Sequence, residues 1–385
     1  MRTVTLAIGF LLMVAYWPDF SGLATTPRWD VGVLMAAALM LAPASRMSAA
    51  HSIGLALVAW LIATLTWSTG QAYGVDTAAK LFVIVVAFAW GAALVDPVPF
   101  IAGAAAGLGV SSLITLAQWF GWQGVESLGS PAGLFWNGNR LAEVAALVLA
   151  AALARRMWWA LPGLAPALVA PYARGAWLTA AILIAVWTWR QAGTFIRFVG
   201  CLIVMWCTLF AAMTATLWRT EQFGLDALAE RLAVWNYTLV NLDWLGHGLG
   251  SFAATAPVLS WGGHVTRAVH PHNEWLWLAY EGGIGAVLLA VGFAVAVWRA
   301  SDDALRLVLL AVGIESLFAM PFHDPATVLF AAVVAGHLAG AHCRVRAAAH
   351  AGGDPLRAGH AVYGDWRESR RTHARPRAVS VRPTV

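Results

Sequence analysis

Charged residues are scarce in this chain. They make up 11% of its 385 residues, whereas hydrophobic residues make up 60%, and the mean hydropathy is +0.70. This composition excludes an ordinary soluble domain, and apolar runs long enough to cross a bilayer recur along most of the sequence. The runs lack the alternation of barrel strands, and in lipid an uninterrupted apolar run satisfies its backbone as a helix. The predicted fold class is therefore an all-α polytopic membrane protein.

Cysteine is also nearly absent, with Cys201, Cys207 and Cys343 as the whole complement. No CxxC pair occurs, so neither a disulfide framework nor a metal site is indicated. The sequence also lacks an internal repeat and a clear cleavable signal peptide. We expect the first apolar run to be a membrane helix.

Twelve apolar segments run along the chain, and each is predicted to be a transmembrane helix. They cover residues 4–17, 31–44, 52–68, 77–95, 98–121, 141–154, 157–170, 176–189, 197–217, 274–298, 304–319 and 326–341. Residues 141–189 also admit a second interpretation, as two helices and a re-entrant piece. Residues 1–341 are expected to form one transmembrane catalytic domain.

Arginines give the predicted orientation. The segment 342–385 contains Arg344, Arg346, Arg357, Arg367, Arg370, Arg371, Arg375, Arg377 and Arg382. Because cytoplasmic loops carry the excess of positive charge, this segment is predicted to be a cytoplasmic tail, and its polar composition predicts disorder. Counting back through the helices places both termini and most other loop arginines on the same side. The net charge of +5 is then a topology signal, and no nucleic-acid partner is expected.

The outward-facing loops hold most of the polar residues that this orientation leaves unexplained. These loops are residues 122–140, 171–175, 218–273 and 320–325. Their polar residues include Asn137, Asn139, Arg140, Arg174, Arg219, Arg231, His247, His264, His270, His272, His323 and Asp324. The chemistry is therefore expected on the non-cytoplasmic face.

The loop from 218 to 273 is too long for a simple connector. Its stretch "GLDALAERLAVWNYTLV" has apolar residues at helical spacing, which predicts an amphipathic helix at the membrane surface. The glycines of "WLGHGLGSF" predict a turn whose backbone approaches another segment closely. Arg231, within the helix, could contact a substrate or simply extend to lipid headgroups.

This loop and the following helix resemble the signature region of the bacterial O-antigen ligase and polymerase superfamily. In "ERLAVWNYTLVNLDWLGHGLGSF" and "HPHNEWLWLAYEGGIG", the matching residues are Arg231, Trp235, the Gly-His-Gly turn at 246–248, His272 and Asn273. Glu281 and Gly283 match the glutamate and glycine that follow the His-Asn pair in the family.

Two further fragments resemble the same family. "LFWNGNRLAEVAALVLA" places Asn139 at the family's entry into a mid-chain helix, and "YARGAWLTAAIL" places Arg174 in its Ser-Arg-Gly-Ala element. The resemblance covers residues 131–285. Ala173 replaces the usual serine, the usual proline before the glycine turn is absent, and the final glycine pair is one residue tighter. None of these departures removes a candidate catalytic side chain.

The resemblance implies a glycosyltransferase of the bacterial inner membrane with a GT-C-like fold. Family members take a glycan from a polyprenyl diphosphate carrier at the periplasmic face, and no nucleotide sugar, cofactor or metal is implied. Ligases transfer the glycan to lipid A core, which is the interpretation we favour from the helix count and the single long loop. Polymerases, which extend a second carrier-linked chain, are the alternative. A transporter of lipid-linked glycans is more remote, because the polar residues gather at loops rather than in broken helices at mid-membrane.

A diphosphate donor requires cationic groups, and the planar fork of arginine pairs two oxygens at once. Arg174 and Arg231 are the first candidates and Arg140 is the third, although each could instead pair with a headgroup phosphate. Asn139, Asn273, His270 and His247 complete the candidate substrate contacts.

His272 is the candidate general base for the acceptor hydroxyl. Asn273 is predicted to cap the following helix, whose positive end favours both a neutral imidazole and an anionic diphosphate. His272 could alternatively do no more than hydrogen-bond a substrate. His270 completes a His-x-His pair, but two histidines without a third ligand are weak evidence for zinc, and a supporting role in the loop is preferred.

Glu281 lies nine residues after His272, half a turn out of phase on a continuous helix, which favours a role in helix packing. His323 and Asp324, in "PFHDP", either reach the same site or form a capped turn between two prolines.

Overall fold

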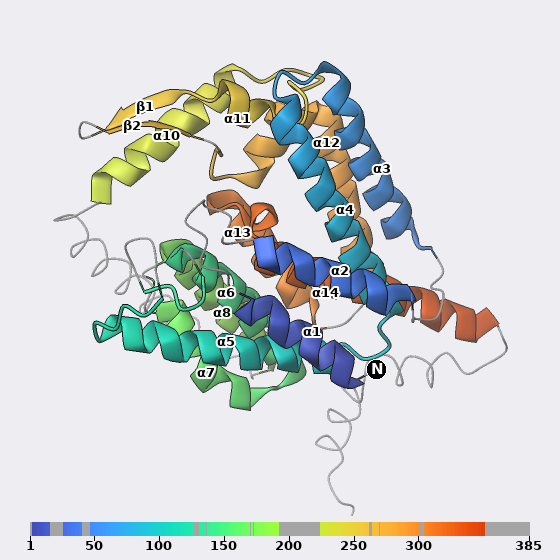
Figure 1. Ribbon diagram of the computed structural model, residues 1–385. Coiled ribbons are helices and arrows are strands. Elements are labelled where there is room, and N and C mark those ends of the chain that lie inside the picture. The colour runs from blue at the N-terminus through green and yellow to red at the C-terminus, as the bar shows by residue number, and fades with distance from the viewer. Residues whose placement is uncertain are drawn as a thin grey trace, which may run out of the picture.

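The computed structural model describes residues 2–15, 26–40, 47–125, 131–135, 137–169, 171, 173–191, 224–261, 264–268, 270–300 and 304–350. The predicted helix 197–217 and most of the predicted tail lie outside these residues. Figure 1 shows a molecule built almost entirely from helices.

The elements follow the apolar segments of the sequence closely. In chain order they are α1 (Arg2–Val14), α2 (Thr26–Met40), α3 (Ala49–Ala63), η1 (Thr64–Trp67), α4 (Gln71–Ala93), α5 (Val98–Trp119), α6 (Gly138–Arg155), η2 (Trp158–Ala160), α7 (Leu161–Val169), α8 (Arg174–Gln191), α10 (Gly224–Val240), α11 (Ser251–Thr255), β1 (Val258–Trp261), β2 (His264–Arg267), α12 (Glu274–Ala300), α13 (Arg306–Phe318), η3 (Pro321–His323) and α14 (Pro325–His350). Every predicted segment within the described residues coincides with a helix. The antiparallel β1–β2 hairpin was not predicted.

Among the described residues, four helical segments are long and apolar enough to cross a membrane. They are Ala49–Trp67 (α3 with η1), α4, α5 and α12. Several of the other helices are short: α1 and α13 have 13 residues each, and α7 has 9, against the ~20 that a spanning helix needs. The helical, membrane-protein character is therefore confirmed, whereas about twelve transmembrane helices and a GT-C-like arrangement stay predictions.

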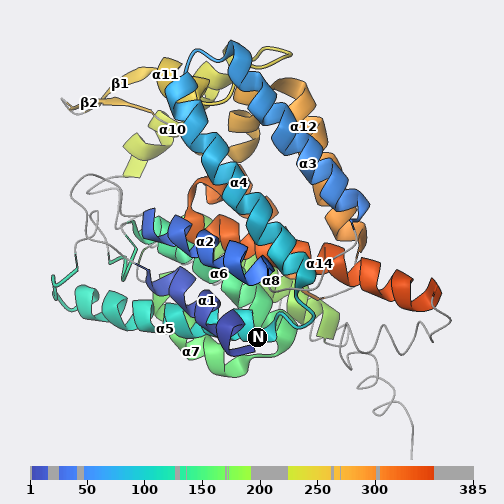
Figure 2. The ribbon, with the colours of Figure 1, turned by 45° about the vertical axis from the view of Figure 1, so that its right-hand side comes forward.

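The helices form two groups in space. α3, α4 and α12 run at a steep angle to α1, α2 and α5, and both views show this arrangement (Figures 1 and 2). The largest buried cluster includes residues of both groups, and α6 is enclosed within it along almost its whole length. A smaller cluster joins α12 to α10 and α11.

Glycines let neighbouring helices approach to backbone contact. A Cβ on Gly103 would lie 2.0 Å from Leu6 O, and one on Gly107 would lie 2.7 Å from Phe10 O. Since the two positions advance together along both helices, α1 and α5 run parallel. Such small-residue contacts are typical of membrane helices, where close van der Waals packing drives association.

Two other helix pairs also have clear relative directions. α3 and α12 run antiparallel, with Trp60 beside Gly285 at one end and Gly54 beside Phe293 at the other. α4 and α14 run parallel through glycine contacts of the same kind. These are the relative directions that alternating membrane crossings require.

The segment after α10 docks on a kink in α12. Gly283 has φ +65 and ψ −169, which interrupts the helix, and Gly246 has φ +73. The His247 N–H donates to Tyr280 O at 2.8 Å, and the Ile284 N–H donates to Trp244 O at 3.1 Å. A Cβ on Gly246 would lie 2.4 Å from Gly283 N, so the predicted close backbone approach is confirmed.

Candidate functional site

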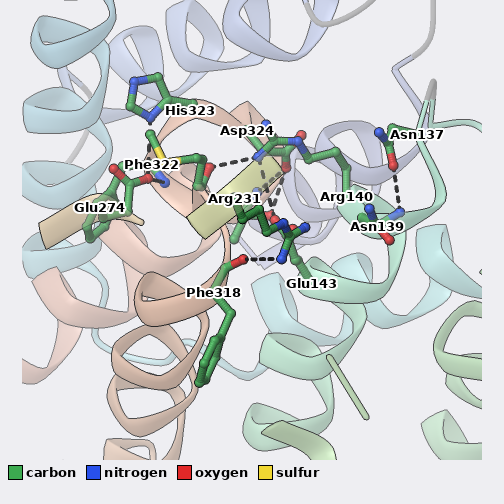
Figure 3. Close-up of polar contacts among 12 residues, drawn as sticks. Asn137, Asn139, Arg140, Glu143, Arg231, Glu274, Phe318, Phe322, His323 and Asp324 are labelled. Carbon is green, nitrogen blue, oxygen red and sulfur yellow. Dashed lines mark hydrogen bonds and ion pairs between the residues drawn. The ribbon is translucent and has the colours of Figure 1, made fainter. Parts of the chain in front are cut away.

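One short turn joins the predicted outward loops. This turn, residues 317–323, includes the C-terminal end of α13 and the residues that lead to α14. Asn273 Nδ2 donates to Leu317 O at 3.1 Å, Arg231 Nη1 to Phe318 O at 3.2 Å, and Arg140 Nη1 to Met320 O at 2.7 Å. Figure 3 shows both guanidinium groups at this turn. The last carbonyls of a helix have no partner within it and carry partial negative charge, so cations bind there.

Five side chains from loops and helices far apart in the sequence form what is here called the arginine–histidine cluster: Arg140, Arg174, Arg231, His272 and His323. The charges of Arg231, Arg140 and His323 all act on the pKa of His272, and the charge of Arg174 acts on the pKa of Arg231. The fold therefore brings together four predicted site residues and His323, which had two interpretations.

Arg140 is presented by the first turn of α6. Asn137 is the N-cap, and its Oδ1 accepts the Asn139 N–H at 2.8 Å. Asn139 therefore lies inside the first turn, and the capping role belongs to Asn137. Glu143, one turn further along, is buried, and its Oε2 lies 3.6 Å from Arg140 Nη1. This ion pair holds the arginine against α6.

Arg174 and Arg231 differ in their surroundings. Arg174 begins α8, is exposed, and has no hydrogen bond or ion pair among the described residues. Arg231 lies half-buried on α10, and burial lowers the pKa of its guanidinium, as does the nearby charge of Arg174. A bound anion would relieve that repulsion. Trp235, one turn after Arg231, donates from Nε1 to Pro271 O at 2.7 Å and ties α10 to the histidine segment.

His272 has an unusual backbone conformation. Its φ of +53 lies in the left-handed region, which histidine adopts more often than most residues but still rarely. The next residue begins the cap: Asn273 Oδ1 accepts the Leu276 N–H at 3.0 Å, so the predicted N-cap of α12 is confirmed. The left-handed residue turns the chain sharply into the helix.

The imidazole of His272 is neutral at pH 7. The side chain is exposed, yet its pKa is lowered to about 4, chiefly because the protein around it displaces water and also because of the positive charges of Arg231 and Arg140. A neutral ring can accept a proton, as a general base must. With so low a pKa, however, it is a weak base until a nearby negative charge offsets the arginines.

A second group of side chains, which the sequence analysis did not assemble, lies beside His272. Glu274, in the first turn of α12, is 3% exposed. Its Oε1 accepts the Phe322 N–H at 2.7 Å and lies 3.3 Å from His323 Nδ1. The His323 ring packs 4.4 Å from the His270 ring. The pKa of His323 is lowered to about 3, chiefly by burial and also by the charge of Arg140.

Asp324 caps α14 rather than orienting a histidine. Its Oδ2 accepts the backbone N–H of Thr327 at 2.9 Å and the Thr327 hydroxyl at 2.7 Å. Of the two interpretations of "PFHDP", Asp324 fits the capped turn and His323 fits the site. The partner of His323 is Glu274, which directly follows His272 and Asn273 in the sequence.

His247 and Glu281 make contacts of their own. His247 Nε2 lies 2.6 Å from Asn241 O, and its ring packs against Tyr280. Glu281 accepts the N–H groups of Gly250 at 2.8 Å and Phe252 at 3.0 Å, joining α12 to the start of α11. Glu281 thus makes the packing contacts favoured for it, and His247, within the glycine turn, contacts Asn241 and Tyr280.

Three buried carboxylates stood in apolar runs without an assigned role. Glu143, Glu274 and Glu315 lie on α6, α12 and α13, and each is 5% exposed or less. A charged residue inside an apolar helix is costly and is usually functional, so this was the available signal. Within the described part of the chain, no group of three or more His, Cys, Asp or Glu residues is arranged to hold a metal ion.

The sequence matches no family model and no curated protein.

Proposed function

We propose that the protein is an integral-membrane glycosyltransferase of the O-antigen ligase type. It transfers a glycan from a polyprenyl diphosphate carrier to a sugar hydroxyl of lipid A core. The observation that supports this best is the arginine–histidine cluster, in which the charges of Arg140 and Arg231 act on a histidine directly before α12 and the charge of Arg174 acts on Arg231. The resemblance in residues 131–285 selects this chemistry among the reactions that such a cluster could support.

The arginines bind the leaving group. Arg174 and Arg231 each offer several N–H donors to the diphosphate, and the N-terminus of α12 adds its partial positive charge. As the bond between the anomeric carbon and the diphosphate oxygen breaks, negative charge grows on that oxygen, and the guanidinium groups stabilise it. Arg140, which is held by Glu143 and Met320 O, adds the electrostatic field of its positive charge.

His272 takes the proton of the acceptor. The acceptor oxygen forms the new bond to the anomeric carbon, and its proton passes to the imidazole. In the free protein the neighbouring arginines keep the pKa of this imidazole low. A bound diphosphate places negative charge beside the ring and so raises its pKa, which makes His272 a stronger base when donor is present.

The cellular setting follows from the same proposal. The chain lies in the bacterial inner membrane with about twelve spanning helices in a GT-C-like arrangement and both termini in the cytoplasm. The cluster then faces the periplasm, where carrier-linked donor and lipid A core meet. Residues 224–240, which form α10 as the amphipathic pattern predicted, lie along the membrane surface, and the exposed Leu232 and Leu239 suit such a position.

Reconstitution tests the proposal. Purified protein in lipid vesicles receives a polyprenyl-diphosphate-linked glycan and, separately, either lipid A core or a second carrier-linked glycan. Transfer to lipid A core is expected, and His272→Ala should reduce its rate by about 10²–10⁴-fold. Transfer to the carrier-linked acceptor alone would establish a polymerase. Movement of the donor across the vesicle without transfer would establish a transporter.

A further inference from the structure

The turn 317–323 determines where the arginines point. Arg140 and Arg231 come from different helices, yet each donates one N–H to a main-chain carbonyl of this turn, at Met320 and Phe318. Each guanidinium has five N–H donors, so the contact with the turn directs it and leaves donors for an anion, although Arg140 also pairs with Glu143. If the turn shifts, both arginines shift with it.

Two side chains hold this turn to the start of α12: Asn273, which donates to Leu317 O, and the buried Glu274. Glu274 accepts the Phe322 N–H at 2.7 Å and faces His323 Nδ1 at 3.3 Å. Trp277, one turn further along α12, packs edge-on against the His323 ring with centroids 4.8 Å apart. Glu274 follows His272 by two residues in the sequence, so its buried carboxylate connects the segment of the candidate base to the turn that directs the arginines. Figure 3 shows Glu274 beside Phe322 and His323.

A purely structural role explains this carboxylate poorly. Glu274 is 3% exposed, and its Oε2 is buried without a hydrogen-bond partner. Burying a carboxyl group with one oxygen unpaired costs stability, and an apolar side chain would pack there at a lower cost. Glu281 on the same helix contrasts with it, because both of its oxygens accept backbone N–H groups.

We propose that Glu274 is a positioning residue, which aligns Arg140 and Arg231 with His272 through the turn 317–323. The inference rests on the proposed function, because the aligned groups are those that bind the diphosphate and receive the proton. Glu274 itself touches neither the donor nor the acceptor.

The first test measures the arginines without any substrate. Purified full-length protein in detergent reacts with phenylglyoxal, and mass spectrometry follows the rate at each arginine. In Glu274→Ala the loosened turn releases Arg140 and Arg231, and their modification should accelerate about fivefold, the effect of losing one hydrogen bond. Glu274→Gln, whose amide oxygen still accepts the Phe322 N–H, should react as the wild type does.

Glu281→Ala is the matched control. It removes a buried carboxylate from the same helix that also accepts backbone N–H groups, but those groups belong to residues 250 and 252. Arg140 and Arg231 should keep their wild-type reactivity in this variant. Equal acceleration in Glu274→Ala and Glu281→Ala, or none in Glu274→Ala, would overturn the proposal.

The second test uses inorganic pyrophosphate as the probe, titrated by calorimetry. Glu274→Ala should weaken its binding about tenfold, whereas Glu274→Gln and Glu281→Ala should bind as the wild type does. If the wild type binds no pyrophosphate while the arginine reactivities change as expected, the diphosphate site fails and the positioning role of Glu274 stands. Unchanged pyrophosphate binding in Glu274→Ala beside normal binding in the wild type would contradict the positioning role.

Discussion

At the scale of single residues, His272 combines a rare backbone conformation with a crowded electrostatic position. A left-handed residue other than glycine costs roughly 1–2 kcal/mol. Here the conformation is fixed on both sides, by the Asn273 cap and by the bond from Trp235 to Pro271 O. Such strain, where the surrounding structure imposes it, is typical of functional sites. The local fold thus places the imidazole where the arginines act on it.

Arg231 should not tolerate lysine. Lysine keeps the positive charge but loses the planar fork that pairs two phosphate oxygens. Arg231→Lys is expected to weaken pyrophosphate binding about tenfold by calorimetry, the effect of losing a charge-assisted hydrogen bond. Arg299→Lys, an exposed change at the opposite end of α12, is the control. An equal loss in both variants would show that the fork of Arg231 has no special role.

The buried histidines should make the protein less stable in mild acid. The folded-state pKa of His323 is about 3, below the ordinary value of 6.5. Between those values the unfolded chain binds more protons than the native one, so stability is full above pH 6.5 and falls as the pH decreases towards 3. The fall is at most about 1.4 kcal/mol per pH unit for this group.

Thermal unfolding at pH 7.5 and pH 5.5 measures this effect. His323→Gln should lower the unfolding temperature less on acidification than the wild type does, because the glutamine binds no proton. An identical acid sensitivity in both proteins would show that His323 is not responsible.

At the scale of elements, α12 has two parts with different tasks. Its first turn holds the histidine segment and the turn 317–323, whereas its middle receives the glycine loop 244–250 at the kink. Both tasks require α12 to change direction at Gly283, where the backbone is extended and left-handed. The kink is what allows one helix to support the site and span a membrane.

Gly283→Ala should destabilise the protein. A Cβ there would lie 2.3 Å from Trp244 O and would force alanine into a left-handed conformation, at a cost of about 1–3 kcal/mol. Gly313→Ala on α13 is the control, because its Cβ would meet no atom within 4 Å and alanine favours the helix. Thermal unfolding should fall for the first variant and stay level or rise for the second. The reverse order would contradict the kink geometry.

At the scale of the whole molecule, helix direction and loop contact agree. The parallel and antiparallel pairs described above have the relative directions that the predicted alternating crossings require. The same alternation predicts that the starts of α6, α8 and α12 and the end of α13 lie at one face, and the positive-inside rule predicts that this face is the outer one. The hydrogen bonds of Arg140, Arg231 and Asn273 to the turn 317–323 independently connect the same loops.

Cysteine labelling tests the orientation. The three native cysteines are first replaced by serine, and single cysteines are introduced at Asp243, in the loop after α10, and at Met47, before α3, both of which are exposed. In spheroplasts a membrane-impermeant maleimide should label Asp243→Cys, while Met47→Cys should react only after the membrane is opened. The opposite pattern would place the cluster in the cytoplasm.

The side chains of the site could be predicted from the sequence better than the hydrogen bonds that connect them. Arg174, Arg231 and His272 were selected by topology and by the resemblance, and Asn273 as a cap by its position before an apolar run. Glu274 was missed although it is adjacent, because its partner is a backbone N–H that belongs to residue 322. Similarly, no sequence pattern assigns an arginine to the carbonyls of a distant turn.

The sequence by itself determined which segments form helices and how few charged residues these segments contain. It also predicted on which side of the molecule the polar residues collect. These follow from local rules, since an apolar run in lipid has to satisfy its own backbone. Only the tertiary structure decided which polar groups from distant segments meet: that Glu274, Arg140 and Arg231 all bind the turn 317–323, and that the His247 ring packs against Tyr280. Such contacts depend on how distant helix ends are brought together, and that is set by packing between helices rather than by any one of them.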